Sequence, residues 1–423
     1  MEAVKGRPRE VSVPMLKALV FLMFAAFAMT TDSVGTVIPQ VIREFHLGLT
    51  AAGSFQYASM SGIGLAAIGL GFLADRIGRR RTILFGLALF CASSALFALG
   101  HRFGFFVMLL FVAGLGIGIF KAGALALIGD ISRSTREHAS IMNLIEGFFG
   151  VGAIIGPAIV ITLLSAGASW KWIYLIAAGL CLLLIAGTLL APFPRPLAPP
   201  AQAADPRDAL KLLGDPLAMF FAALLMLYVG AEAAIYVWAP TYFAGYHGAN
   251  AWLATYTVSI FFVLRAAGRF VGAWLLARLN WTIVLVICSC AMTVLFWIAV
   301  AGGRGVAAYA LPATGLFMSV LYPTINSTGI NCFDRRQHGS IAGFLLFFTC
   351  ISAVLAPLAM GAAGDVFGTS DYSMILGGLF ATLLAALCLW NWARRPAARR
   401  LAERNREDYA ADPLDQIAAQ PLA

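Results

Sequence analysis

Long apolar runs alternate with short polar or Gly/Pro-containing breaks along the whole chain. Each run is close to the roughly 20 residues that an α-helix needs to cross a bilayer. The runs cover residues 15–41, 50–73, 82–100, 103–129, 139–165, 171–192, 215–244, 251–277, 281–301, 305–331, 339–366 and 372–393. The pattern predicts an all-α membrane protein with twelve transmembrane helices.

Composition agrees with this class, because 61% of the residues are hydrophobic and only 12% are charged. Most Lys and Arg residues fall in breaks on one side of the predicted membrane, and only Arg43, Arg102, Lys171 and Arg304 fall on the other. By the positive-inside rule, we expect both termini on the cytoplasmic side. We expect the protein to lie in the inner membrane. The net charge of +9 reflects this topology, and no soluble domain offers a patch for nucleic acid.

The chain start could imitate a cleaved signal peptide, with Lys5, Arg7 and Arg9 before an apolar run. We favour a retained helix, because the run continues past the small residues at 26–28 and takes part in an internal repeat. Seven cysteines lie inside or at the ends of predicted spans without a CxxC pair, so we expect no disulfide, metal site or cofactor.

The two halves of the chain repeat with an offset of 200 residues. His138, Ser140, Ile141, Phe148 and Pro157 align with His338, Ser340, Ile341, Phe348 and Pro357, and Asp32 aligns with Glu232. A Pro-rich, charged stretch that would not continue a helix joins the halves. We therefore expect two pseudo-symmetric six-helix bundles at 1–190 and 214–394, a cytoplasmic linker at 191–213 and a cytoplasmic tail at 395–423. Parallel six-helix repeats of this kind are typical of major facilitator transporters.

Ionisable residues inside the spans are the first candidates for function, because they are costly in lipid. They are Asp32, Lys121, Glu146, Glu232, Arg265 and Arg269. Spans 3, 6, 9 and 12 carry none, so we expect them to face lipid while the other eight surround a polar cavity. The alternative is that these charges only form structural ion pairs, which we favour for Arg269.

The fixed rise per residue of an α-helix places some of these charges at similar depths in the membrane. Lys121 lies nine residues before Asp130, and Glu146 lies eight after His138, so both sit about 12 to 13 Å from the short loop between their helices. We therefore predict a Lys121–Glu146 pair. Glu232 and Arg265 differ in depth by about 6 Å, within the reach of an arginine, and we predict that they pair as well. Asp32 and Glu146 are the candidate proton-linked carboxylates.

The pseudo-equivalent of Lys121 in the second half is Tyr322. A cation and a phenol near the repeat axis suit a hydroxyl-bearing or anionic solute. Further candidates for hydrogen bonds and aromatic walls of a pocket are Gln56, Asn143, Tyr236, Trp238 and Asn326. Each of these could instead serve only in packing or at the membrane interface.

The segment "GFLADRIGRRR" at 71–81 lies between spans 2 and 3. It resembles the signature loop of the major facilitator superfamily, G-x-x-x-D-R-x-G-R-R, and occupies the same place. The resemblance implies a conformational gate on the cytoplasmic face, in which Asp75 and the arginines pair with neighbouring helix ends. Its residues here are Gly71, Asp75, Arg76, Gly78, Arg79 and Arg80. The arginines would also enforce topology.

Within that superfamily, "YVGAE" at 228–232, "GRFVGAWLLAR" at 268–278 and "LYPTINSTGI" at 321–330 resemble the fucose, galactose and glucose:proton symporters. "NLIEGFFGVGAII" at 143–155 resembles their helix 5. The first half departs from that family, because the helix 4 glutamate falls at Lys121 and the helix 1 acid, Asp32, lies a turn early. A reversed charge favours an acidic or phosphorylated solute, or a lysine that acts as an internal counter-ion.

These features predict a monomeric secondary transporter that moves a sugar, sugar acid or related organic anion together with protons. The rival is a proton-coupled drug or metabolite exporter. "GAIIGP" at 152–157 is half of the exporter motif of helix 5, but Ile159 and Val160 replace its glycine pair and the helix 4 arginine is missing near Leu110. A non-transporting receptor of the same fold is a third reading. An enzyme is disfavoured, since no nucleophile with a base, phosphate loop or metal cluster is evident.

Overall fold

The structure is a computed structural model that describes residues 12–69, 76–132, 135–194, 211–334 and 337–410. Within these residues the regular elements are all helical. The first half contains α1 (Val13–Thr31), α2 (Val34–Phe45), α3 (Leu49–Ala52), α4 (Ser54–Gly69), α6 (Arg79–Ala95), η1 (Leu96–Leu99), α7 (Phe103–Ile131), α8 (Thr135–Ser165) and α9 (Trp172–Leu190). The predicted linker at 191–213 lies largely outside the described residues.

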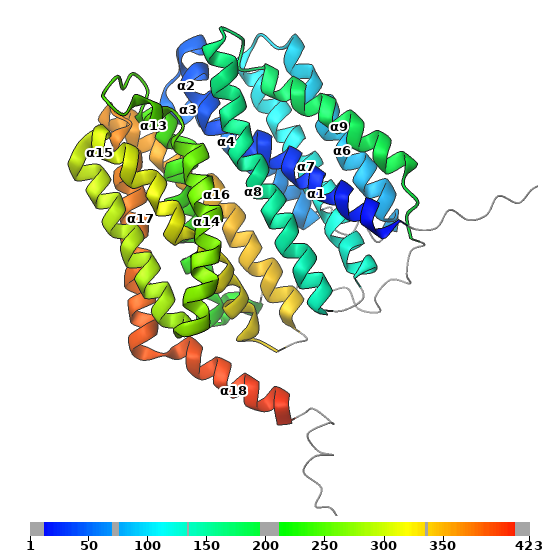
Figure 1. Cartoon of the computed structure of the whole chain (residues 1–423), viewed down its shortest axis with the longest axis vertical. Coiled ribbons are helices and arrows are strands. Elements are labelled where there is room, and N and C mark those ends of the chain that lie inside the picture. The colour runs from blue at the N-terminus through cyan, green and yellow to red at the C-terminus, as the bar shows by residue number, and fades with distance from the viewer. Residues whose placement is uncertain (1–11, 70–75, 133–134, 195–210, 335–336, 411–423) are drawn as a thin grey trace, which may run out of the picture.

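The second half begins with a short η2 (Leu212–Gly214). It continues through α11 (Pro216–Ala233), η3 (Ala234–Trp238), α12 (Ala239–Tyr242), α13 (Ala251–Thr255), α14 (Thr257–Arg278), α15 (Trp281–Asn331), α16 (His338–Phe367), α17 (Asp371–Arg394) and α18 (Pro396–Ala410). In Figure 1 the helices of the first half gather on one side and those of the second half on the other, with α8 and α16 in the middle.

The predicted twelve-helix fold is confirmed. Ten helical stretches among the described residues are long and apolar enough to cross a membrane. One of them, Trp281–Asn331, consists of two helices that meet at Gly303, where φ is 68°. This left-handed conformation favours glycine. The span that contains α4, cut short by the boundary of the described residues, is the twelfth.

Helix contacts inside each half follow the repeat. In the first half α1 packs against α8 and α4 against α7, and in the second half α11 packs against α16 and α14 against α15. Glycines allow this close approach, since a Cβ on Gly62 of α4 would lie 2.3 Å from the carbonyl oxygen of Phe111 in α7. Small residues at such crossings are the usual means by which membrane helices approach each other.

The two halves meet mainly at one end of the molecule. We call the end that carries the start of α1 and the end of α17 the terminal face, and the other end, with α3 and α13, the opposite face (Figure 1). Between the halves, α3 and α4 pack against α16, α2 packs against η3 and α12, and α8 packs against α14. No comparable packing of α7 against α15 is present in the described part of the chain. The halves are therefore joined toward the opposite face.

Candidate functional site

The first span is broken at a buried acid. α1 ends at Thr31, and α2 begins at Val34 after Asp32 and Ser33. The Asp32 side chain is 8% exposed, and one of its carboxylate oxygens accepts a hydrogen bond of 3.1 Å from the Thr31 hydroxyl. Hydroxyl groups near such breaks satisfy backbone and side-chain acceptors that water cannot reach. The break places an acid inside the membrane with one hydroxyl as its hydrogen-bond partner.

The seventh span is irregular at the equivalent depth. α11 ends at Ala233, next to the buried acid Glu232, and the π-helical η3 follows. Pro240 lies two residues beyond η3, and a proline removes one backbone donor and disfavours regular helix before it. Broken helices at matching positions of the two repeats are typical binding-site elements of secondary transporters.

Arg265 of α14 forms an ion pair with Glu232 of α11. The pair that the depth argument predicts is therefore present. Both side chains are largely buried, and the Arg265 guanidinium also lies 5.9 Å from the centroid of the Phe262 ring. This pair connects α14 to α11, and loss of either member would leave an uncompensated charge away from water.

The two broken spans touch each other. A Cβ on Gly35 of α2 would lie only 1.9 Å from the carbonyl oxygen of Tyr236 in η3, so the two backbones are in direct contact. Nearby, the Gln56 side-chain amide donates a hydrogen bond of 3.0 Å to the Tyr236 hydroxyl. The Trp238 indole and the Tyr57 hydroxyl each donate a bond of 3.2 Å to the carbonyl of Pro357 in α16.

These contacts change the expected place of three predicted pocket residues. Gln56 and Trp238 are fully buried and Tyr236 is 7% exposed. In this conformation all three belong to the closed contact between the halves. The Gln56 amide nitrogen, the Tyr236 hydroxyl and the Trp238 indole have partners within the protein, whereas the Gln56 side-chain oxygen is buried without one. Contact with a solute would require that the halves separate here, so their role in binding stays a prediction.

The predicted ion pair between Lys121 and Glu146 is wrong for this structure. Lys121 of α7 is partly buried and lies between two rings of α1, with its ammonium 5.7 Å from the centroids of both Phe24 and Phe27. Among the described residues it has no salt-bridge partner. Equal depth along two helices is not sufficient, because each side chain must also point toward the other.

Glu146 turns toward the other half of the molecule. One of its carboxylate oxygens lies 3.4 Å from a guanidinium nitrogen of Arg269 in α14. Glu146 is 55% exposed and Arg269 is 39% exposed, so the pair remains accessible. Arg269 is therefore in an ion pair, with an acid that comes from the opposite half. A purely structural role for it stays a prediction.

The remaining pocket candidates lie along α15 and α8. Tyr322 is partly buried, and its ring centroid lies 5.6 Å from that of the fully buried Tyr228. Asn326, one turn further along α15, is also partly buried. The side chain of Asn143 lies outside the described residues.

The signature loop is described in part, since Gly71 and Asp75 lie outside the described residues. Gly78 adopts a φ of 88° before α6, and the next two arginines contact helix ends of the first half. The Arg79 guanidinium lies 2.9 Å from the Asp130 carboxylate at the end of α7. Arg80 donates to the carbonyls of Thr188, at 3.2 Å, and Leu189 near the end of α9. Arg76 is exposed. Arg79 and Arg80 thus contact helix ends, whereas the role of the loop as a conformational gate stays a prediction.

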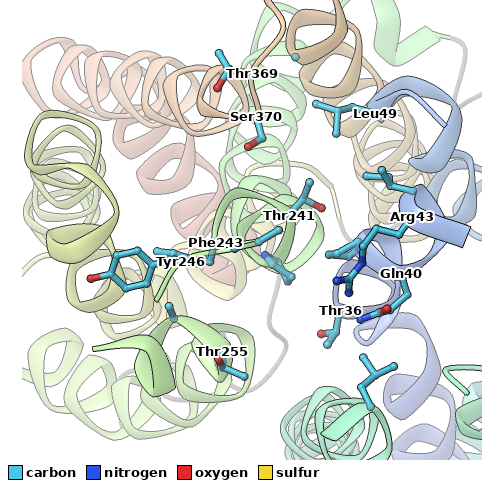
Figure 2. Close-up of a pocket in the computed structure, with 18 of the residues that line it drawn as sticks. Thr36, Gln40, Arg43, Leu49, Thr241, Phe243, Tyr246, Thr255, Thr369 and Ser370 are labelled. Atoms are coloured by element: carbon cyan, nitrogen blue, oxygen red, sulfur yellow. The ribbon is translucent and has the colours of Figure 1, made fainter. Parts of the chain in front are cut away.

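A wide cavity of about 1190 Å³ lies at the opposite face between the halves. Figure 2 shows Gln40 and Arg43 of α2 on one side of it and Thr241 and Tyr246 on the other. We call this cavity the vestibule. It is lined by residues next to Gly35 and η3, so it ends where these two segments are in contact.

Beside this vestibule lies a connection that the sequence did not reveal. The Asp365 carboxylate of α16 accepts hydrogen bonds from the backbone amides of Leu49, at 2.6 Å, and Thr50, at 2.8 Å. Asp365 therefore caps the start of α3, which belongs to the other half. Backbone amides carry no side-chain signal, so no sequence pattern pointed to this partner.

Within the described residues, no group of three His, Cys, Asp or Glu side chains could hold a metal ion. The seven cysteines are unpaired.

Comparison with known proteins identifies the family. The sequence model of the Major Facilitator Superfamily matches residues 20–357. The chain is 25% identical over 364 residues to a glucose/galactose transporter of Brucella abortus, which covers 83% of this chain and 87% of that protein. Its fold is similar to that of the E. coli fucose:proton symporter FucP, with a TM-score of 0.63, 22% identity and coverage of 90% and 99% of the two chains. It is also similar to the nucleoside transporter NupG, with a TM-score of 0.71, 16% identity and coverage of 90% and 98%. The chain belongs to the Major Facilitator Superfamily.

Proposed function

We propose that this major facilitator transporter carries a small polar solute, a sugar, sugar acid or related organic anion, by proton-coupled symport with alternating access. The observation that carries the proposal is the contact between the two broken spans. Each has an acid at its break, Asp32 in the first half and Glu232 in the second, and each break lies where the halves meet. A glucose/galactose transporter among its relatives supports the sugar-like solute.

Alternating access follows from where the halves are joined. Contacts through Asp365, Gln56 and Tyr57 bind the halves toward the opposite face. Rocking of one half against the other would break these contacts and bring α7 toward α15 at the terminal face. Arg79 and Arg80 would then act from the signature loop, as the family resemblance implies.

Proton coupling is supported by buried carboxylates in the pathway. Asp32 lies within electrostatic range of Lys121, Glu232 and Arg265, so a change in its charge is transmitted to the other ionisable groups of the site. FucP, whose fold this chain shares, is described as a fucose:proton symporter. Lys121, Tyr322 and Asn326 are the proposed solute contacts.

We further propose that the protein works as a monomer in the inner membrane with both termini in the cytoplasm. An even number of spans places the termini on one side, and the excess of Lys and Arg around that face marks it as cytoplasmic. The terminal face is then the cytoplasmic face. The vestibule would open to the exterior.

The alternative function is proton-coupled export of drugs or metabolites. It draws on "GAIIGP" at 152–157, where a Cβ on Gly152 would lie 2.1 Å from the carbonyl oxygen of Ala25 and one on Gly156 2.2 Å from that of Met29. These glycines serve close packing of α8 against α1, which explains the motif without an exporter role. We therefore retain proton-coupled symport as the proposal.

A crosslinking experiment tests the mechanism. Cysteines would replace Ile131 at the end of α7 and Asn331 at the end of α15 in a chain without its native cysteines, and a bifunctional reagent would join them. Alternating access requires these ends to separate in each cycle, so crosslinked protein in proteoliposomes should lose transport and recover it when a cleavable reagent is cut. Undiminished turnover in fully crosslinked protein would refute alternating access.

A further inference from the structure

Two membrane-interior charges stand apart from the rest. Of the three interior cations, Arg265 is paired with Glu232 and Arg269 with Glu146. Lys121 forms no salt bridge among the described residues, and its ammonium lies 5.7 Å from the ring centroids of Phe24 and Phe27. Of the three interior acids, only Asp32 has no ion-pair partner in the described part of the chain.

These two unpaired groups belong to the same half and to neighbouring helices. Lys121 projects from α7 onto the rings of Phe24 and Phe27, and Phe27 is five residues before Asp32 on the same span. Their charges act on each other, although they form no salt bridge. The Thr31 hydroxyl donates a hydrogen bond to Asp32, and the ionisable groups within electrostatic range of Asp32 are Lys121, Glu232, Arg265 and Tyr236.

Charge balance selects what can bind. With Asp32 ionised and Lys121 protonated, the empty site is neutral, because Glu232 and Arg265 cancel each other. If Asp32 takes up a proton and a neutral solute binds, Lys121 is left as an uncompensated cation in the membrane, which is costly. If an anion binds while Asp32 stays ionised, the site becomes negative. Uptake of one proton and one monoanion keeps it neutral.

We infer that the solute is a hydroxyl-rich carboxylate whose carboxylate pairs with Lys121, and that it crosses electroneutrally with one proton carried by Asp32. This inference rests on the proposed transport function and names its solute class and stoichiometry. The proton adds to a carboxylate oxygen of Asp32 and leaves it on the other side. Tyr322 and Asn326, both partly buried on α15, offer groups for the solute hydroxyls.

Binding is tested with matched solutes on the purified full-length protein. D-glucuronate and D-galacturonate are compared with D-glucose and D-galactose by thermal shift and by titration calorimetry. We expect the uronates alone to raise Tm. Lys121→Gln should weaken uronate binding about tenfold or more, as expected for the loss of one charge-assisted contact, while Lys121→Arg retains it. Lys171→Gln, at the opposite face beside Glu44, is the control that removes a positive charge elsewhere.

Transport is tested in proteoliposomes. Uronate uptake should follow an imposed pH gradient and should not change when valinomycin and potassium set an inside-negative potential. Asp32→Asn should lose pH-driven accumulation while it still exchanges labelled for unlabelled uronate. Uptake that responds to the potential would overturn electroneutrality.

The outcomes separate this inference from the proposed function. Neutral hexoses transported equally by wild type and Lys121→Gln would refute the carboxylate and leave the transporter proposal intact. Folded wild-type protein that binds and carries neither the uronates nor the hexoses would refute this inference and the sugar-like solute of the proposed function.

Discussion

Glu146 of α8 and Arg269 of α14 form an ion pair of 3.4 Å that joins the two halves of the transporter. Both side chains are substantially exposed, and exposed pairs are worth about 0 to 1 kcal/mol. This connection can break at low cost when the halves move. It also removes Glu146 from the neighbourhood in which we expected it, beside Lys121.

Glu146→Gln should therefore have a mild effect. We expect the free energy of unfolding to fall by less than about 1 kcal/mol, because the pair is screened by water. Accumulation driven by a pH gradient should persist, in contrast to Asp32→Asn. Thermal unfolding and proteoliposome uptake measure the two effects. If folded Glu146→Gln protein exchanges solute but no longer accumulates it, Glu146 carries the proton and our assignment to Asp32 is wrong.

The Glu232–Arg265 pair should behave differently, because its members are largely buried. Glu232→Gln or Arg265→Gln alone should destabilise the protein by about 3 to 5 kcal/mol, since each leaves one uncompensated charge in the membrane. The double variant should be less destabilised than the sum of the single changes.

Unfolding in detergent, followed for the wild type, both single variants and the double variant, gives the coupling energy of this pair. Additive losses, with no coupling between the two sites, would show that the ion pair does not stabilise the fold.

Gly35→Val should prevent closure at the opposite face. The added side chain would begin 1.9 Å from the carbonyl oxygen of Tyr236, a backbone atom that cannot move aside without moving η3. We expect a folded protein with transport reduced at least about tenfold, as for other losses of required geometry. A cysteine at Thr241 should become more reactive toward a membrane-impermeant reagent.

Gly179→Val is the matched control, because nothing lies within 4 Å of a Cβ at that position of α9. Transport at the wild-type rate in Gly35→Val would mean that the α2–η3 contact is not part of the cycle.

Asp365→Ala should weaken the contact that holds the two halves together beside the vestibule. It removes both hydrogen bonds to the start of α3, and loss of an exposed helix cap costs about 0.5 to 1 kcal/mol. The equilibrium should shift about two- to fivefold toward opening at this face, because RT is about 0.6 kcal/mol. Distance measurements between spin labels at Gln40 and Thr369 would report the shift.

Asp371→Ala provides the control for that measurement. Asp371 is an exposed acid at the same face, with Arg304 as its partner 3.9 Å away within the second half. An equal shift in both variants would attribute the effect to surface charge and not to the cap that joins the halves.

The sequence by itself determined the number of spans, the repeat and the depth of each charge. Apolar runs of bilayer length must form helices in lipid, and the fixed rise per residue converts position into depth. This was sufficient to predict the fold and to match Glu232 with Arg265. It was also sufficient to place Asp32 and Lys121 inside the membrane.

Only the tertiary structure decided which charges meet. Lys121 and Glu146 have matching depths, but the rotation of each helix about its axis is set by packing, which turns Lys121 onto Phe24 and Phe27 and Glu146 toward Arg269. The cap of Asp365 on Leu49 was equally hidden, because a backbone amide is the same at every residue. Depth follows from local helical geometry, whereas direction and long-range partners follow from how the helices pack.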